Sequence, residues 1–179
     1  MTGDETRPDL VRRLRAGDPA AAEELDREYR AHLVRFCFGY LRSVDEAEDA
    51  VQDVFAKLWK ADALPQSLRA WLYTVARNHC LNALRGRGRR PDAKPMPSDM
   101  ELVASCTGLP TRLVRQEEYG RIERLVADLS EAERELIRLR YGEDLSREEI
   151  AQVLELPVST VKSRLFETMK KLRQRAEGS

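Results

Sequence analysis

Residues 146–165 have the sequence SREEIAQVLELPVSTVKSRL. Ser146 and Glu149 have the spacing of a capping box, which begins a helix, and Pro157 ends that helix and prepares a second one. Ala151 is small where the two helix axes come close. Apolar residues fall where crossed helices must meet, namely at Ile150, Leu154, Leu156, Val161 and Leu165. The pattern predicts a helix-turn-helix over residues 145–175, whose second helix enters a DNA groove.

Polar and basic side chains crowd the start of that second helix. They are Ser159, Thr160, Lys162, Ser163 and Arg164. This part of a recognition helix reaches base edges and phosphates, while Lys170, Lys171, Arg173 and Arg175 can follow the DNA backbone. The structural alternative is an amphipathic hairpin whose lysines only solvate one face. That alternative does not explain why short hydroxyl residues, which are poor helix formers, gather there.

The rest of the chain also has helical signals and indicates an all-α fold. Asp18-Pro19 begins a helix that reaches about Tyr40, Ser43-Val-Asp-Glu46 is a capping box for a helix to about Lys60, and Ser67 caps a third helix. The third helix has a core face of Leu68, Leu72, Val75, Ala76 and Ala83. Further helices are predicted over residues 117–128, over 131–141 behind a Ser130–Glu133 box, over 147–154 and over 158–175.

These signals group into two small helical bundles joined by a flexible linker, the second bundle containing the helix-turn-helix. Glycines and prolines from Gly86 to Pro97 cannot continue a helix, so the linker is predicted over residues 87–115. We therefore expect an N-terminal tail over 1–17, a first domain over 18–86 and a second domain over 116–176. Two small domains are reasonable for 179 residues.

Net charge alone conceals the distribution of charge. The 31 basic and 31 acidic residues cancel, yet residues 66–90 hold arginines and no acid, whereas residues 45–53 hold acids and no base. The acidic run consists of Asp45, Glu46, Glu48, Asp49 and Asp53. Opposite patches imply two different partners.

Cofactor and membrane signals are weak in this sequence. Cys37, Cys80 and Cys106 are widely spaced and odd in number, so they predict neither a disulfide framework nor a zinc site; we expect no cofactor and no metal, and interpret them as buried thiols. No apolar run approaches the ~20 residues that span a bilayer, and the N-terminus is acidic and polar. A cytoplasmic protein without membrane insertion is expected.

The third helix also carries a stripe suited to unpaired nucleic acid. At about 100° per residue, Trp71, Asn78 and Asn82 lie within about 40° of one another, with Thr74 and Arg85 beside them. Aromatic stacking and arginine contacts bind single strands, and an amide can read the edge of a flipped base. The plainer alternatives are core packing for Trp71 and a solvated face for the asparagines.

Three segments resemble the extracytoplasmic-function group of bacterial RNA polymerase sigma factors, in the order that this family has them. They are Ala47-Glu-Asp-Ala-Val-Gln-Asp-Val-Phe55 with Leu58-Trp59, Leu68-Arg-Ala-Trp-Leu-Tyr-Thr-Val-Ala-Arg-Asn78, and Leu136-Ile-Arg-Leu-Arg-Tyr141 leading into the helix-turn-helix. The resemblance covers about residues 18–175. It implies an alternative sigma factor that binds core polymerase and directs initiation, and it makes an anti-sigma factor the expected regulator.

The resemblance also implies roles for particular residues. The acidic second helix would dock on the clamp helices of the polymerase β′ subunit through Asp49, Gln52, Asp53 and Phe55. Trp71, Arg77, Asn78, Asn82 and Arg85, with the loop at 61–66, would hold the melted minus-ten strand and a flipped base. The second bundle would bind the β flap and read minus-thirty-five duplex DNA through Ser159, Thr160, Lys162, Ser163, Arg164 and Phe166.

Two positions depart from the family pattern. Glu167 stands where a basic residue often follows the aromatic, and a carboxylate there should repel phosphate. Glu155 stands in the turn where a glycine is common, although Leu156-Pro157 preserves the turn's shape.

Two other classes of function compete with a sigma factor. A helix-turn-helix repressor or activator would dimerise and bind duplex DNA tightly without polymerase, but it gives the acidic helix no role. An enzyme has little support, because His32 and His79 have no carboxylate or cysteine partner at usable spacing and no glycine loop cradles phosphate. We therefore expect no enzyme.

Overall fold

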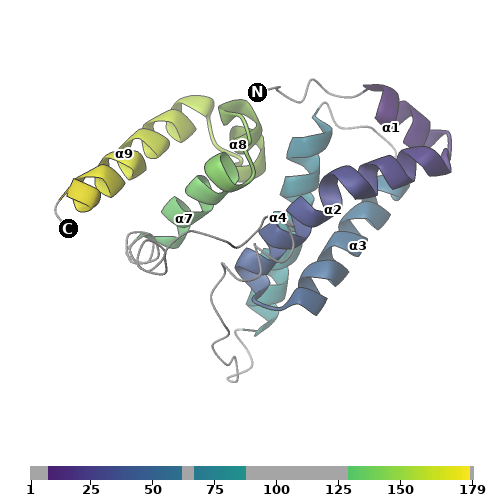
Figure 1. The fold of residues 1–179 in the computed structure, drawn as a ribbon, viewed down its shortest axis with the longest axis horizontal. Helices are drawn as coiled ribbons and strands as arrows, with labels where there is room; N and C mark the ends of the chain where they lie inside the picture. Colours follow the sequence, from purple (N-terminus) through teal and green to yellow (C-terminus); the bar gives the residue numbers. More distant parts are fainter. Residues whose placement is uncertain (1–7, 62–66, 88–128, 178–179) are drawn as a thin grey trace, which may run out of the picture. The chain divides into compact units, whose positions relative to one another are not determined.

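The computed structural model describes residues 8–61, 67–87 and 129–177. Every element in these ranges is helical, as the sequence predicts (Figure 1). The chain divides into two compact units, residues 1–109 and 110–179. The predicted linker, apart from Arg87, and the predicted helix over 117–128 lie outside the described residues.

The first unit packs three long helices on one another. They are α2 (Pro19–Leu41), α3 (Val44–Lys60) and α4 (Leu68–Arg87). Each of the three contacts the other two, and Phe36 of α2 meets Tyr73 of α4 edge to face with ring centroids 5.1 Å apart. The predicted core face of α4 is buried at Leu68, Leu72 and Ala76 but only half-buried at Val75 and Ala83.

Side-chain caps set the helix starts that the sequence predicted. Asp18 accepts a hydrogen bond from the Ala20 amide at 3.0 Å, and Ser67 accepts one from the Ala70 amide at 3.2 Å. Ser43 accepts from the Glu46 amide at 3.4 Å. These bonds satisfy amide groups that the first turn of a helix leaves without partners.

The tail predicted over residues 1–17 contains a helix, so that part of the prediction is wrong. Helix α1 (Pro8–Arg15) buries Leu10, Val11 and Leu14 and packs on α2. Gly17 then takes a left-handed conformation, with φ of 75°, and turns the chain into α2. The sequence signal was weak because three apolar residues over two turns do not establish a period.

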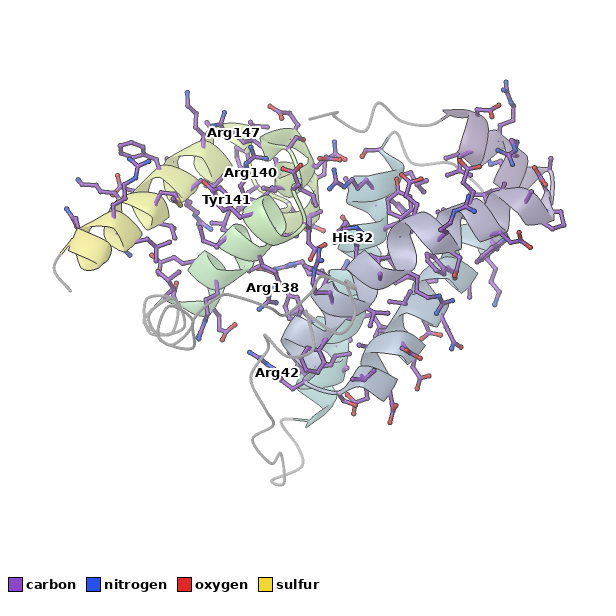
Figure 2. The ribbon with its side chains drawn as sticks, in the orientation of Figure 1. His32, Arg42, Arg138, Arg140, Tyr141 and Arg147 are labelled. Carbon is purple, nitrogen blue, oxygen red and sulfur yellow. The ribbon has the colours of Figure 1, made fainter. Side chains whose placement is uncertain are left out.

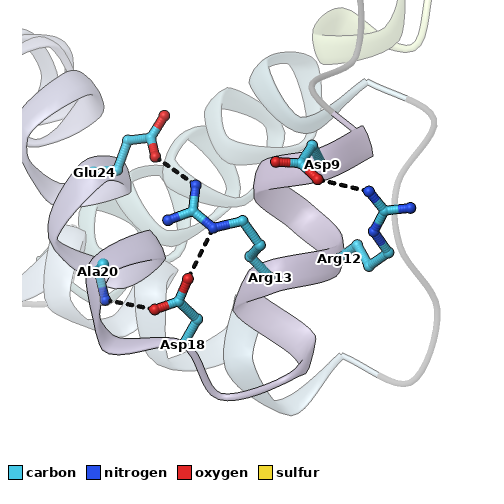
Figure 3. Close-up of polar contacts among 6 residues, drawn as sticks. All are labelled: Asp9, Arg12, Arg13, Asp18, Ala20 and Glu24. Carbon is cyan, nitrogen blue, oxygen red and sulfur yellow. Dashed lines mark hydrogen bonds and ion pairs between the residues drawn. The ribbon is translucent and has the colours of Figure 1, made fainter.

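One arginine fastens α1 to the beginning of α2 (Figure 3). Nε of Arg13 lies 2.8 Å from Asp18 Oδ2, and its Nη1 lies 2.9 Å from Glu24 Oε2. Two hydrogen bonds to the Asp18 carboxylate hold its pKa below the ordinary value. The bond from Arg13 has the larger effect, and the bond from the Ala20 amide has the smaller one. The N-cap of α2 is therefore a charged carboxylate, which suits the positive end of the helix dipole.

The described part of the second unit, residues 129–177, contains three α-helices and a π turn. They are α7 (Glu131–Ile137), the π turn η1 (Arg138–Gly142), α8 (Arg147–Leu154) and α9 (Val158–Glu177). Ser130 and Ser146 both form the complete capping box, with Glu133 and Glu149. Helices α8 and α9 pack on each other and bury Ile150, Val161 and Leu165, so the predicted helix-turn-helix is confirmed.

The helix predicted over 131–141 ends early as an α-helix. From Arg138 the backbone widens into the π turn η1, and the Leu145 amide donates to the Leu139 carbonyl at 3.0 Å. Arg140 Nη1 donates to the Leu145 carbonyl at 2.8 Å, which fixes the loop into α8, and Tyr141 is exposed beside it (Figure 2). Helical periodicity alone does not distinguish this turn from an α-helix.

None of the described helices is both long enough and apolar enough to cross a membrane.

Candidate nucleic-acid interface

The turn between α8 and α9 sets the direction of the candidate reading helix. Glu155 ends α8 in the left-handed conformation, with φ of 54°, and the Leu156 amide donates to the Ala151 carbonyl at 2.9 Å. The Pro157 carbonyl then accepts from the amides of Thr160 and Val161 at 2.9 and 3.1 Å. The turn keeps its shape without glycine, as expected. The backbone of Glu155 is strained, because a residue with a Cβ is unfavourable in the left-handed conformation.

Most of the side chains predicted to meet duplex DNA project outward from α9. Ser159, Lys162, Ser163, Arg164 and Phe166 are exposed, whereas Thr160 is half-buried. Phe166 is 67% exposed, unusual for so large an apolar side chain that has no partner to cover it. Lys162 and Arg164 form no ion pair within the part of the chain that the structure describes. Both cations are thus available to phosphate or base edges.

The hydroxyl groups of this helix are partly committed to its backbone. Ser163 Oγ donates to the Thr160 carbonyl at 3.0 Å, and Thr168 Oγ1, which is buried, donates to the Arg164 carbonyl at 2.8 Å. A hydroxyl that donates in this way can still accept a hydrogen bond. Ser163 therefore suits a donor such as a base amino group better than a phosphate oxygen.

Lys171 forms an ion pair within the protein, whereas the sequence suggested that it follows the DNA backbone. Its Nζ pairs with Glu133 Oε1 on α7, so this lysine ties α9 to α7. Lys171 and the backbone and hydroxyl of Ser130 lower the pKa of Glu133 from 4.5 to about 2. Lys170 and Arg173 are exposed and remain candidates for phosphate contact.

Helix α4 brings together four of the five residues predicted to hold melted DNA. Asn78, Asn82 and Arg85 are exposed, and Trp71 on the same stripe is half-buried. Arg85 Nη1 donates to Asn82 Oδ1 at 3.1 Å, which leaves the Asn82 amide group free to donate. Arg77 is half-buried and lies about 100° around the helix from Asn78, so it is not part of this stripe.

Helix α3 presents a second, acidic surface. Asp49, Gln52 and Asp53 are exposed, but Phe55 is only 4% exposed and lies beneath Arg30, whose guanidinium is 5.7 Å from the ring centroid. The exposed aromatic is Trp59, which meets Phe55 edge to face. Trp59 was not among the residues predicted to contact a partner, although it lies seven residues from Gln52 and hence on the same face.

One expectation about the histidines is wrong. His79 Nδ1 lies 3.4 Å from Asp53 Oδ2, so His79 does have a carboxylate neighbour, across the α3–α4 contact. Sequence spacing could not reveal it, because the two residues are far apart in the chain. Cys37 and Cys80 are buried, as interpreted, and Cys106 lies outside the described residues. The described residues contain no cluster of His, Cys, Asp and Glu that could hold a metal.

Comparison with known proteins finds two family models in this chain. Residues 25–90 match the model described as "Sigma-70 region 2", and residues 119–172 match the model described as "Sigma-70, region 4". The first includes α3 and α4, and the second includes α7, α8 and most of α9.

Curated proteins match over nearly the whole length. The RNA polymerase sigma-H factor of Pseudomonas aeruginosa is 32% identical over 176 residues, covering 93% of this chain and 91% of that protein. The ECF RNA polymerase sigma factor RpoE of Cereibacter sphaeroides is 31% identical over 183 residues, covering 97% and 98%. The ECF RNA polymerase sigma-E factor of Escherichia coli is 34% identical over 167 residues, covering 88% and 87%.

Two solved structures share the fold. CnrH, in complex with the cytosolic domain of CnrY, matches with a TM-score of 0.63 at 22% identity, covering 95% of this chain and 96% of that one. RpoE of Bartonella quintana, in complex with the anti-sigma factor NepR, matches with a TM-score of 0.57 at 24% identity, covering 87% and 98%.

Proposed function

This chain belongs to the extracytoplasmic-function group of sigma-70 factors, and from that premise we propose that its two units divide promoter recognition between them. A member of this family is a transcription initiation factor and not an enzyme. The observation that carries the division of roles is the outward face of α9. Its exposed Lys162, Ser163 and Arg164 stand on a helix-turn-helix, within the match to region 4.

In this proposal α9 reads the minus-thirty-five element as a duplex. Lys162 and Arg164 supply phosphate or guanine contacts, Ser163 accepts from a base amino group, and the exposed ring of Phe166 contacts the groove. Near the start of α9, Ser159 and the half-buried Thr160 contact the DNA backbone. The second unit also binds the polymerase β flap.

The α4 stripe holds the melted minus-ten strand. Trp71 supplies a stacking surface, Asn78 and Asn82 read the edge of an unpaired base, and Arg85 neutralises the strand. The Arg85–Asn82 hydrogen bond supports this arrangement because it fixes which atoms of Asn82 remain to donate. Arg77 lies outside the stripe and contacts the strand from the side of the helix.

The acidic face of α3 docks on the β′ clamp helices. Asp49, Gln52 and Asp53 are exposed there, and Asp53 is steadied by His79. Phe55 supports this face from beneath, and Trp59 supplies the exposed apolar contact. Aromatic residues are enriched in protein interfaces, and acidic groups select a basic partner surface.

The protein acts in the cytoplasm, where polymerase and promoter are, and an anti-sigma factor regulates it. The solved structures of CnrH with CnrY and of RpoE with NepR support this partner class. Residues 87–115 serve as the linker between a first domain over 18–86 and a second over 116–176.

The test is transcription in vitro with purified core RNA polymerase, the full chain and a pool of promoter fragments. The fragments come from the genome of the organism that encodes this chain. We expect initiation at particular promoters only when the chain is added. Arg164→Ala should lower initiation about tenfold at a promoter that depends on its minus-thirty-five element. Arg12→Ala, which removes an exposed arginine from α1, is the matched control and should have no effect.

Two outcomes would contradict the proposal. The first is the absence of promoter-dependent initiation across the whole pool. The second is a stable dimer that binds duplex DNA tightly without polymerase, since helix-turn-helix repressors usually pair two half-sites.

A further inference from the structure

Glu167 is an acidic residue in the middle of the basic helix α9. Its side chain is exposed, and Arg164 and Lys170 lie three residues away on either side. A separation of four residues places Glu167 about 40° around the helix from Ser163 and one turn further along. The carboxylate therefore projects from the same outward face as the groups proposed to read DNA.

The structure leaves this carboxylate without a neutralising partner. A glutamate four residues before a lysine is the favourable arrangement for an ion pair within a helix. Lys171 has that spacing, but its ammonium pairs with Glu133 on α7. Among the residues that the structure describes, Glu167 forms no hydrogen bond or ion pair. Its carboxylate thus faces whatever α9 approaches.

A free carboxylate at a DNA surface has only a few favourable positions. Against the backbone it repels phosphate, and against guanine or thymine edges in the major groove it meets acceptor atoms. Amino groups on the groove edges of cytosine and adenine are the available donors. Carboxylate side chains pair with the N4 amino group of cytosine, whereas adenine is read best by Asn or Gln, which can both accept and donate.

We propose that Glu167 determines specificity, by accepting a hydrogen bond from the N4 amino group of a cytosine in the duplex element that α9 reads. This inference rests on the proposed function of α9. Glu167 then disfavours guanine and thymine at that position, because their acceptor atoms would face a desolvated carboxylate. Adenine is disfavoured less strongly, because its N7 acceptor lies beside its amino group. The neighbouring Ser163 and Arg164 read adjacent positions.

The test uses holoenzyme reconstituted from core polymerase and the full chain. Holoenzyme selects promoters from a pool whose minus-thirty-five positions are randomised, and the retained fragments are sequenced. The variants are Glu167→Gln, which removes the charge at constant size, and Glu167→Arg. Glu131→Gln removes the same charge from an exposed residue of α7 and is the control.

We expect the wild-type chain to enrich cytosine at one position about tenfold over the other bases, in line with the discrimination that a base contact supplies. Glu167→Gln should lose this cytosine preference and shift toward adenine, and Glu167→Arg should shift toward guanine at the same position. The control should keep the wild-type preference.

The inference is overturned if Glu167→Gln raises retention of all sequences alike and leaves the base preferences unchanged, since Glu167 would then only repel phosphate. A wild-type chain that enriches a sequence without that cytosine also overturns it, while the proposed function stands. If the wild-type holoenzyme enriches no sequence, the proposed function itself fails and the inference fails with it.

Discussion

Helices α3 and α9 are both amphipathic, yet their outward faces carry opposite charge. Helix α3 exposes Asp49 and Asp53, whereas α9 exposes Lys162 and Arg164. A net charge of zero over the whole chain therefore conceals two faces of opposite charge. The two faces also differ in their neighbours, because Asp53 on the acidic face lies against His79 of α4, while the basic face stands on a helix-turn-helix.

The largest expected effect comes from the first unit, at Trp71. Replacing Trp71 by Ala should lower open-complex formation about five- to a hundredfold, because stacking of one base on an aromatic side chain contributes ~1–3 kcal/mol. The measurement is permanganate reactivity of unpaired thymines at saturating polymerase. Trp71→Phe keeps an aromatic surface and should recover most of the opening, which separates stacking from loss of fold.

Trp59 on α3 tests the other surface of the first unit. Trp59→Ala should weaken binding to core polymerase but leave opening intact once polymerase is saturating. If Trp59→Ala blocks opening as strongly as Trp71→Ala does, the α3 and α4 surfaces do not have separate roles.

The second effect is smaller and concerns how α9 is held on α7. The pKa of Glu133 is lowered from 4.5 to about 2. Its carboxylate therefore contributes fully to the stability of the folded state at pH values above 4.5. That contribution is lost as the pH falls from 4.5 toward 2. Glu133→Gln keeps the capping-box spacing and removes the pairing with Lys171, so the variant should be less stable near neutral pH by about 0.5 kcal/mol.

Hydrogen exchange of the α9 amides from pH 7 to pH 3 measures this effect. Protection of wild-type α9, corrected for intrinsic exchange rates, should fall toward that of Glu133→Gln as the pH decreases. Equal protection at pH 7 would mean that Lys171 is not tied to α7 and is available to DNA.

The third effect compares two left-handed turns, one in each unit. Gly17 has φ of 75° with open space around its Cα, and Glu155 has φ of 54°. A residue with a side chain is strained by ~1–2 kcal/mol in this conformation. Glycine avoids the strain, but the greater freedom of its unfolded chain lowers the free energy of unfolding by about 0.4–1 kcal/mol. Gly17→Ala should therefore destabilise the first unit, and Glu155→Gly should stabilise the second, each by about 0.5–1 kcal/mol.

Denaturant unfolding with hydrogen-exchange readout in each unit tests this pair of substitutions. The account of these turns is wrong if Glu155→Gly lowers the stability of the second unit.

Local signals predicted most of the fold. The capping residues Asp18, Ser130 and Ser146 established where helices begin, because a cap is a contact between residues two or three apart. The same signals failed where the structure depends on contacts at a distance. Helix α1 is too short to show a period and is secured through Arg13 to Asp18 and Glu24.

The candidate sites show the same limit. Exposure of Asn78, Asn82 and Arg164 followed from helical periodicity. The pairing of His79 with Asp53, and of Lys171 with Glu133, joins different helices and could not be read from spacing. Phe55 was predicted to lie on the contact surface with its neighbours, but the guanidinium of Arg30 lies over its ring. Trp59 is the exposed aromatic residue of this helix.

In the proposed function the acidic and basic faces serve different partners. The most direct measurement is the affinity of the full chain for core polymerase in the absence of DNA, with a charge reversal on each face. Asp49→Lys should weaken this affinity about tenfold, because a like charge would face the basic partner surface. Arg164→Glu should leave it within about twofold of the wild type. An equal loss from both variants, or no loss from Asp49→Lys, would contradict the account.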